Sequence, residues 1–246
     1  DNSSNNSTVF TAVLQNLVDQ KFPVNDDMKE DAATIIKQIK SAYKSNYGDN
    51  YKDSLNQALT SAGYKNLSEY RQRMIKQIQY ANFLLDYIDD HFDDVFNDYY
   101  QQCAPKYVSL IKISVSDTSS PTDDETSKLN EVKELISNTD KSFGDIAQDY
   151  SDDSTSSKKG SLGIVDSKDT SGIANSYGKD VFNAIEALSE GQVSDVITGD
   201  NGYYFVKVTS TDKKTLKKEL KKTDIDSPLL AYDDYCLLYT SDAADE

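Results

Sequence analysis

The chain has no Trp, a single His and only two Cys among its 246 residues. One His excludes any site that requires a pair of imidazoles. The two cysteines, Cys103 and Cys236, do not have the spacing of a zinc or redox motif. Whether they form a disulfide is left open, because sequence alone does not give the distance between their Cα atoms.

Basic residues are also scarce, with 26 Lys and Arg against 42 Asp and Glu and a formal net charge of −16. This balance argues against nucleic acid as a partner, because phosphates are neutralised by a surplus of Lys and Arg. It suits a protein that stays in solution, or one that meets basic or unfolded chains. The chain also lacks an apolar run of about 18 residues, so the sequence predicts no membrane-spanning helix.

The two ends differ from the rest of the chain. Residues 1–8 are polar and lack an initiator Met, and we interpret them as a linker left after an N-terminal segment was removed. Residues 236–246, CLLYTSDAADE, fit nothing that precedes them, and we interpret them as a non-native tail. An ordinary disordered tail is the alternative.

Between these ends, the first hundred residues have the apolar spacing of helices. The spacing predicts helices over 10–22, 26–47 and 51–62, followed by one long helix over 67–99. Asn66 and Glu69 form a capping box at the start of the long helix. Pro105 then disfavours helix and begins an extended segment.

The middle of the chain changes character after Pro105. Residues 106–115 alternate and are rich in β-branched side chains, which predicts a strand. A helix is predicted over 125–136, and a Lys-rich helix begins near residue 213. The intervening stretch, 143–208, predicts a helix, an acidic Ser-rich loop, a strand start between glycines, a second helix, a turn and a final strand.

Within this stretch, FGDIAQDYSDDSTSSKKGSLG, DVFNAIEALSEGQVSDVIT and NGYYFVKV occur in the order and with the residue types of the parvulin family of peptidyl-prolyl isomerases, which they resemble. Upstream, YGDNYKDSLNQALTSAGYKNLSEYRQRMIKQIQYANFLLDYI resembles the N-terminal helical domain of PrsA-type foldases. Each motif is weak alone, and their common order makes the resemblance specific over roughly residues 8–225.

The resemblance implies an α+β fold, in which a parvulin-like β-α-β domain of about four strands is inserted into a helical chaperone (cradle) domain. We expect a linker at 1–8 and the N-terminal helical domain at 9–105. The parvulin-like domain then follows at 106–210, the start of a C-terminal helical segment at 211–235 and the tail at 236–246. Such proteins isomerise X-Pro bonds without a cofactor or metal.

The resemblance also implies partners and a location. The partners are unfolded or partly folded secreted proteins, and a homodimer is left open. The location is the outer face of the cell membrane of a Gram-positive bacterium, reached only through a lipid anchor on a Cys that would precede Asp1.

The site residues follow from matching positions one by one. Asp153 falls beside the isomerised bond, and Thr198 falls in the loop before the last strand. Four residues fall at or near the pocket for the proline ring: Leu162, Tyr177, Val181 and, as an alternative filler, Phe182. From the sequence itself, Asp153 equally suits a turn cap, and Leu162 and Val181 suit an ordinary core.

The chain departs from the family at the paired-His centre. Tyr204 stands where the last-strand His is usual, and Lys112, or Leu110 in a shifted register, stands at the first-strand position. Lys112, Tyr204 and Asp153 are therefore the candidate catalytic residues. His91 lies elsewhere, among acidic residues that surround a helix, where a solvated face is favoured over a metal site. A non-catalytic holdase chaperone is the alternative function.

Overall fold

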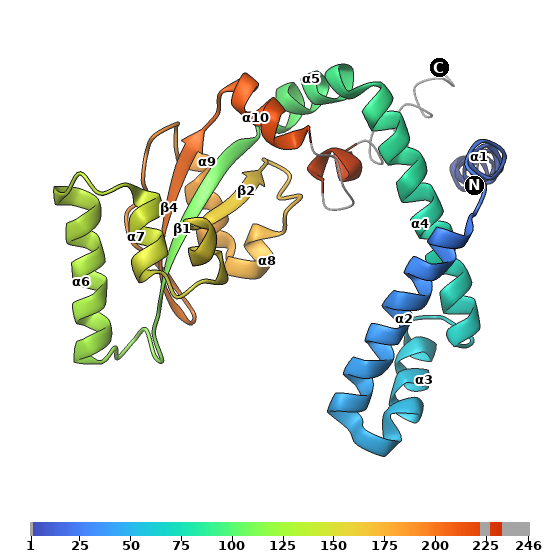
Figure 1. The fold of residues 1–246 in the computed structure, drawn as a ribbon, viewed down its shortest axis with the longest axis horizontal. Coiled ribbons are helices and arrows are strands. Elements are labelled where there is room, and N and C mark those ends of the chain that lie inside the picture. Colours follow the sequence, from blue (N-terminus) through green and yellow to red (C-terminus); the bar gives the residue numbers. More distant parts are fainter. Residues whose placement is uncertain (1, 222–226, 233–246) are drawn as a thin grey trace. The chain divides into compact units, whose positions relative to one another are not determined.

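A computed structural model describes residues 2–221 and 227–232 of the chain (Figure 1). The chain divides into two compact units, with the boundary in the described residues between Asp90 and His91. The described part of the first unit is helical, and the second unit contains a four-stranded antiparallel sheet together with helices. The predicted α+β class is therefore confirmed.

The first unit is held together by α2 packing on α3 and α4. Asn25 caps α2 by accepting a hydrogen bond from the Met28 N–H at 2.9 Å, which satisfies one of the free donors of the first turn. The apolar side chains of α2 recur at steps of three and four residues, and they pack against those of α4 in one buried cluster. The elements of this unit are α1 (Asn2–Lys21), α2 (Asp26–Tyr47), the 3-10 turn η1 (Gly48–Asn50), α3 (Tyr51–Ser61) and α4 (Leu67–Asp90).

Two expectations about these helices are wrong. Residues 2–8, predicted as a linker, belong to α1, where they extend a helix whose nucleation, the costly step, needs no contribution from them. The helix predicted over 67–99 is interrupted at His91, the N-cap residue of a separate helix, α5 (Phe92–Cys103). The break leaves Asp93 and Asp94 in the first turn of a new helix, where the helix dipole stabilises negative charge.

The second unit is organised by its sheet, whose strand order is β2-β1-β4-β3. Both central strands have a largely buried pattern, because helices cover the two faces of the sheet (Figure 1). The predicted strand over 106–115 is confirmed. The strands are β1 (Lys106–Ser114), β2 (Ser161–Val165), β3 (Ile197–Gly199) and β4 (Gly202–Ser210).

Each face of the sheet has its own apolar core. Leu110 and Val206 face α8 and α9, and Ile111 and Phe205 face α6 and α7. The side on which α8 and α9 pack is the one that carries the candidate site. The helices of this unit are α5 (Phe92–Cys103), α6 (Asp123–Asn138), α7 (Phe143–Tyr150), the 3-10 turn η2 (Ser154–Lys158), α8 (Ile173–Tyr177), α9 (Lys179–Ala187) and α10 (Lys213–Leu220).

A buried hydrogen bond attaches α5 to the sheet. The hydroxyl of Tyr99 donates to Asp166 at 2.8 Å, and both residues are almost fully buried. The other carboxylate oxygen of Asp166 accepts from the Lys168 N–H and from Thr170. Burial, and then the charge of Asp166, raises the pKa of Tyr99 above its ordinary value. The α5 helix, which the sequence assigns to the helical domain, is therefore part of the compact unit that contains the sheet.

Two further features bear on the sequence interpretation. No helix among the described residues is both long and apolar enough to cross a membrane. Cys103 is buried at the end of α5, whereas Cys236 and the interpreted tail 236–246 lie outside the described residues.

Replacing Tyr99 by Phe is expected to lower the free energy of unfolding of the second unit by about 1–3 kcal/mol, because the buried Asp166 loses a donor. Tyr150→Phe is the matched control, since its hydroxyl also donates to a carboxylate, that of Glu131, but at an exposed position. Chemical denaturation of both variants measures the difference. Equal destabilisation by the two changes would contradict the role given to the buried bond.

Candidate functional site

A pocket of about 420 Å³ opens on the side of the sheet that α8 and α9 cover. It is bounded by α8, the start of α9, β3 and the turn between β3 and β4. Four of the residues predicted from the sequence line it: Tyr177, Val181, Thr198 and Tyr204. These residues are far apart in sequence, and the packing of α8 and α9 against β3 and β4 brings them together.

Tyr204 is the central side chain of this pocket. It lies opposite Lys112 in the β1–β4 register, and the Lys112 ammonium is 5.8 Å from the centre of its ring. Its ring meets that of Tyr177 edge to face, with centroids 6.2 Å apart, a favoured arrangement of aromatic pairs. Its hydroxyl donates to the side-chain oxygen of Asn201 at 2.6 Å.

The position of the Tyr204 ring depends on Gly199. A Cβ atom at residue 199 would lie 2.7 Å from Cε2 of Tyr204, which is closer than two carbon atoms approach without strain. Glycine therefore lets the ring lie against the β3–β4 hairpin. The two residues between these strands, Asp200 and Asn201, form the tight turn.

Asp153 lies beside the pocket and does two things. It caps η2, since one carboxylate oxygen accepts from both the N–H and the hydroxyl of Thr155, at 2.9 and 2.7 Å. The same oxygen is 3.4 Å from the hydroxyl of Tyr177. The turn-cap interpretation of Asp153 thus describes its local contacts, and its charge also reaches the pocket.

The remaining predicted residues do not line the pocket. Leu162 on β2 and Phe182 on α9 pack against the apolar core beneath it. Leu162 also lines a different pocket of about 370 Å³, together with Tyr107 and Pro228. Lys112 is half-buried on β1 next to Tyr204, and Leu110, the other first-strand candidate, is fully buried.

Electrostatics keep the two phenols of the site in their neutral form. Burial, followed by the nearby charge of Asp153, raises the pKa of Tyr177 to about 12. Burial also raises the pKa of Tyr204, with smaller contributions from the charges of Asp153 and Asp200. Both hydroxyls are therefore protonated at neutral pH and able to donate a hydrogen bond.

Sequence reasoning missed Asn201 and Lys106. The Asn-Gly pair at 201–202 is a strong hairpin signal, but nothing in the sequence indicates that Asn201 accepts from Tyr204. Lys106 donates to three main-chain carbonyls at the end of α9, those of Ile185, Glu186 and Leu188, at 2.9, 2.7 and 3.1 Å. It thereby satisfies carbonyls that the helix leaves free and holds the helix that carries Val181.

The described residues also limit what else the site can hold. They contain no group of three or more His, Cys, Asp and Glu residues arranged to bind a metal ion. The chemistry available in the pocket is therefore hydrogen bonding from the phenols, charge from Lys112 and Asp153, and an apolar wall at Val181.

Residues 110–210 match the sequence model of the rotamase family, described as the PPIC-type PPIase domain. Curated relatives named foldase protein PrsA match as well. Those of Staphylococcus aureus strains MRSA252 and Newman are 34% and 33% identical over 101 residues. The match covers 40% of this chain and only 29% of each relative. The resemblance to PrsA-type foldases with a parvulin-type domain is thus confirmed.

Solved structures of proteins with the same name are similar over nearly the whole chain but at low identity. The PrsA structure from Streptococcus pneumoniae is 19% identical, covering 99% of this chain and 85% of that one, with a TM-score of 0.44. The one from Lactococcus lactis is 16% identical, covering 97% and 81%, with a TM-score of 0.41. Similarity at this level says nothing about the site.

Replacing Lys106 by Met should lower the free energy of unfolding of the second unit by about 1–3 kcal/mol, because three partly buried carbonyls lose their donor. Lys133→Met, on the exposed side of α6, removes the same charge and should change stability by less than about 0.5 kcal/mol. Thermal and chemical denaturation measure both. Similar values for the two variants would show that Lys106 does not secure α9.

Tyr177→Phe should alter how stability depends on pH. Because the folded-state pKa of Tyr177 is raised from 10.0 to about 12, its contribution is fully present below pH 10.0 and is lost as pH rises through about 12. The free energy of unfolding of the wild type should therefore fall more steeply over this interval than that of the variant. Parallel curves for the two proteins would contradict the raised pKa.

Proposed function

We propose that residues 110–210, which match the sequence model of the PPIC-type PPIase domain, catalyse cis–trans isomerisation of X-Pro peptide bonds. The observation that carries the proposal is the pocket in which Tyr177, Val181, Thr198 and Tyr204 come together on one side of the sheet. Its volume of about 420 Å³ is within the range of small-ligand sites, which is about 300–1,000 Å³.

X-Pro isomerisation makes and breaks no covalent bond, so the protein needs no nucleophile. Rotation about an X-Pro bond has a barrier of about 18–20 kcal/mol, because the amide has partial double-bond character. Removing water from the amide and donating hydrogen bonds to the twisted state lower this barrier. In this proposal Val181 supplies apolar surface for the proline ring, and the neutral phenol of Tyr177, whose contact with Asp153 is long at 3.4 Å, supplies a donor. Tyr204, whose hydroxyl donates to Asn201, forms a wall of the pocket.

The charged neighbours have supporting roles in the proposal. Asp153 keeps the pKa of Tyr177 high, and Lys112 lies over the Tyr204 ring. Lys112 is the more suitable first-strand candidate, because it pairs directly with Tyr204 in the register. Leu110 is apolar and buried opposite Val206, where it has no donor to offer. Thr198 adds an exposed hydroxyl at the rim of the pocket.

A non-catalytic holdase is the second candidate function. It is favoured by the replacement of both family His positions, since Tyr204 is committed to Asn201 through a 2.6 Å hydrogen bond. In that case the pocket holds proline-containing segments without accelerating rotation, and the helical unit contributes to client binding.

For the whole protein we propose a foldase that acts on unfolded or partly folded secreted proteins outside the membrane. The curated relatives named as PrsA foldases support this proposal. The proposal includes anchoring to the outer face of a Gram-positive cell membrane through a lipid on a residue preceding Asp1.

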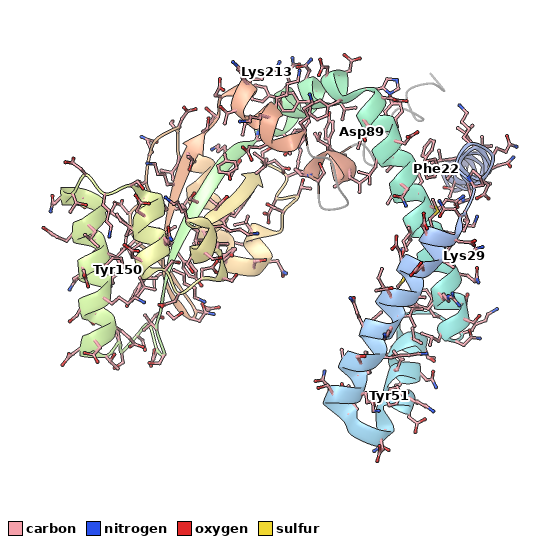
Figure 2. The ribbon with its side chains drawn as sticks, viewed as in Figure 1. Phe22, Lys29, Tyr51, Asp89, Tyr150 and Lys213 are labelled. Atoms are coloured by element: carbon pink, nitrogen blue, oxygen red, sulfur yellow. The ribbon has the colours of Figure 1, made fainter. Side chains whose placement is uncertain are left out.

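A protease-coupled assay on a short proline peptide tests the isomerase. The full chain should accelerate isomerisation, and Tyr204→Ala should lower kcat/KM by about tenfold or more, because it removes a wall of the pocket and the ring against which Tyr177 packs. Tyr150→Phe, on α7 at the opposite side of the sheet (Figure 2), should keep the wild-type value. Circular dichroism confirms that each variant is folded.

The same proteins separate the two candidate functions. Suppression of the aggregation of an unfolded client by a folded full chain that shows no rate above background would eliminate catalysis and leave the holdase. A rate that survives unchanged in Tyr204→Ala would place the reaction elsewhere than in this pocket.

A further inference from the structure

A second hollow is formed by residues of the first unit alone. It is a groove of about 580 Å³ bounded by α2 and the first turns of α3 and α4. Its apolar surface comes from Ala33, Ile36 and Leu67, and the ring of Tyr51 stands at the start of α3 (Figure 2). No part of the proposed isomerisation uses this groove.

Four cations surround this apolar surface: Lys37, Lys40 and Lys44 on α2 and Arg71 on α4. All four side chains are exposed, and we call the hollow they line the cationic groove. Among the residues that the structure describes, no Asp or Glu lines it. Within 2–221 and 227–232, the ion pairs of the structure involve other lysines and leave these four cations without a carboxylate partner.

This concentration of positive charge is unusual for the chain. Residues 91–246 carry 30 acidic against 16 basic residues, whereas residues 1–90 carry 12 against 10. From Ala32 to Tyr47, α2 has three lysines and no acidic residue. Solubility is already served by the large negative charge, so an unneutralised positive stripe in a groove indicates an anionic ligand.

The spacing of the cations suits a linear ligand. Lys37, Lys40 and Lys44 follow each other at steps of three and four residues, which places them along one face of α2. At about 1.5 Å per residue they extend over about 10 Å. In an extended peptide, side chains on one face repeat about every 7 Å, so two or three alternate carboxylates would span the same length.

The apolar floor distinguishes between possible anions. Ile36 is almost buried and Leu67 is half-buried, and both contribute to the floor between the cations. A phosphate polymer has no apolar groups to place there, whereas an extended peptide presents every second side chain to the opposite face. The ligand must therefore carry both anionic and apolar groups.

We propose that the cationic groove binds a short extended peptide segment in which carboxylate side chains occur together with apolar ones. Carboxylates pair with Lys37, Lys40, Lys44 and Arg71, and apolar side chains contact Ile36 and Leu67. The groove selects acidic segments of a protein ligand and acts independently of X-Pro isomerisation.

The probe is a fluorescein-labelled peptide of about ten residues that combines Glu with Leu and Val and contains no Pro, long enough to span the groove. Fluorescence anisotropy with the full chain should show saturable binding. The affinity should fall as ionic strength rises from about 0.05 to about 0.5 M, because exposed ion pairs are screened. The same peptide with Gln in place of every Glu should bind about tenfold more weakly or not at all.

Paired substitutions locate the binding. Lys40→Gln together with Lys44→Gln should weaken the Glu peptide by about five- to tenfold, since each exposed pair contributes modestly. Lys52→Gln together with Lys65→Gln is the matched control, because these exposed lysines lie in the same unit and do not line the groove. Both double variants should keep the wild-type isomerisation rate in the proline-peptide assay. A failure of the peptide-binding proposal is therefore distinguishable from a failure of the isomerase proposal.

Three results would overturn the proposal. One is equal binding of the Glu peptide by both double variants. Another is saturable binding of inorganic polyphosphate that the Lys40→Gln/Lys44→Gln change weakens, in the absence of peptide binding. The third is concentration-dependent dimerisation, seen by sedimentation, that the same change abolishes while no peptide binds, because a second acidic copy of the chain would then occupy the groove.

Discussion

The antiparallel pairing of β1 with β4 is the constraint on which the second unit depends. Both strands are central in the sheet and buried on two faces, so a slip of one residue would turn every apolar side chain to the wrong layer. The observed register sets Lys112 opposite Tyr204 and Leu110 opposite Val206. It therefore decides at once where the cores lie and which polar side chains reach the candidate site.

The site lies where the paired β1 and β4 meet the hairpin that β3 and β4 form. Gly199 gives the Tyr204 ring its space, and α8 brings Tyr177 against the ring edge. Because both phenols are partly withdrawn from water beside Asp153, their pKa values rise and their protons are retained. The pocket thus contains two neutral phenols.

The two units differ in how they use charge. In the second unit, two charged side chains stabilise the fold: Asp166 accepts from Tyr99, and Lys106 donates to carbonyls at the end of α9. In the first unit, the lysines of the cationic groove have no carboxylate among its lining residues. Charge that is not used to stabilise the fold is available for a ligand, which is why the groove indicates binding.

Local patterns in the sequence were sufficient for the elements. Alternation predicted β1, and apolar spacing predicted α2 and α6, because these signals depend only on neighbouring residues. The motif order also identified the parvulin-like stretch, and four of its predicted residues do line one pocket. The helix over 67–99 was predicted too long, since apolar periodicity continues through His91 while the acidic residues around it favour a new helix start.

What the sequence by itself determined is therefore the class of fold, its helices and strands, and the residue types available for chemistry. Only the tertiary structure decided that Asp153 reaches Tyr177, that Leu162 lies outside the pocket, that Lys106 secures α9, and that four cations surround one apolar floor. The physical reason is that helices and strands arise from interactions a few residues apart. Pockets, pKa shifts and unpaired charges depend on side chains that only long-range packing brings within a few ångströms of one another.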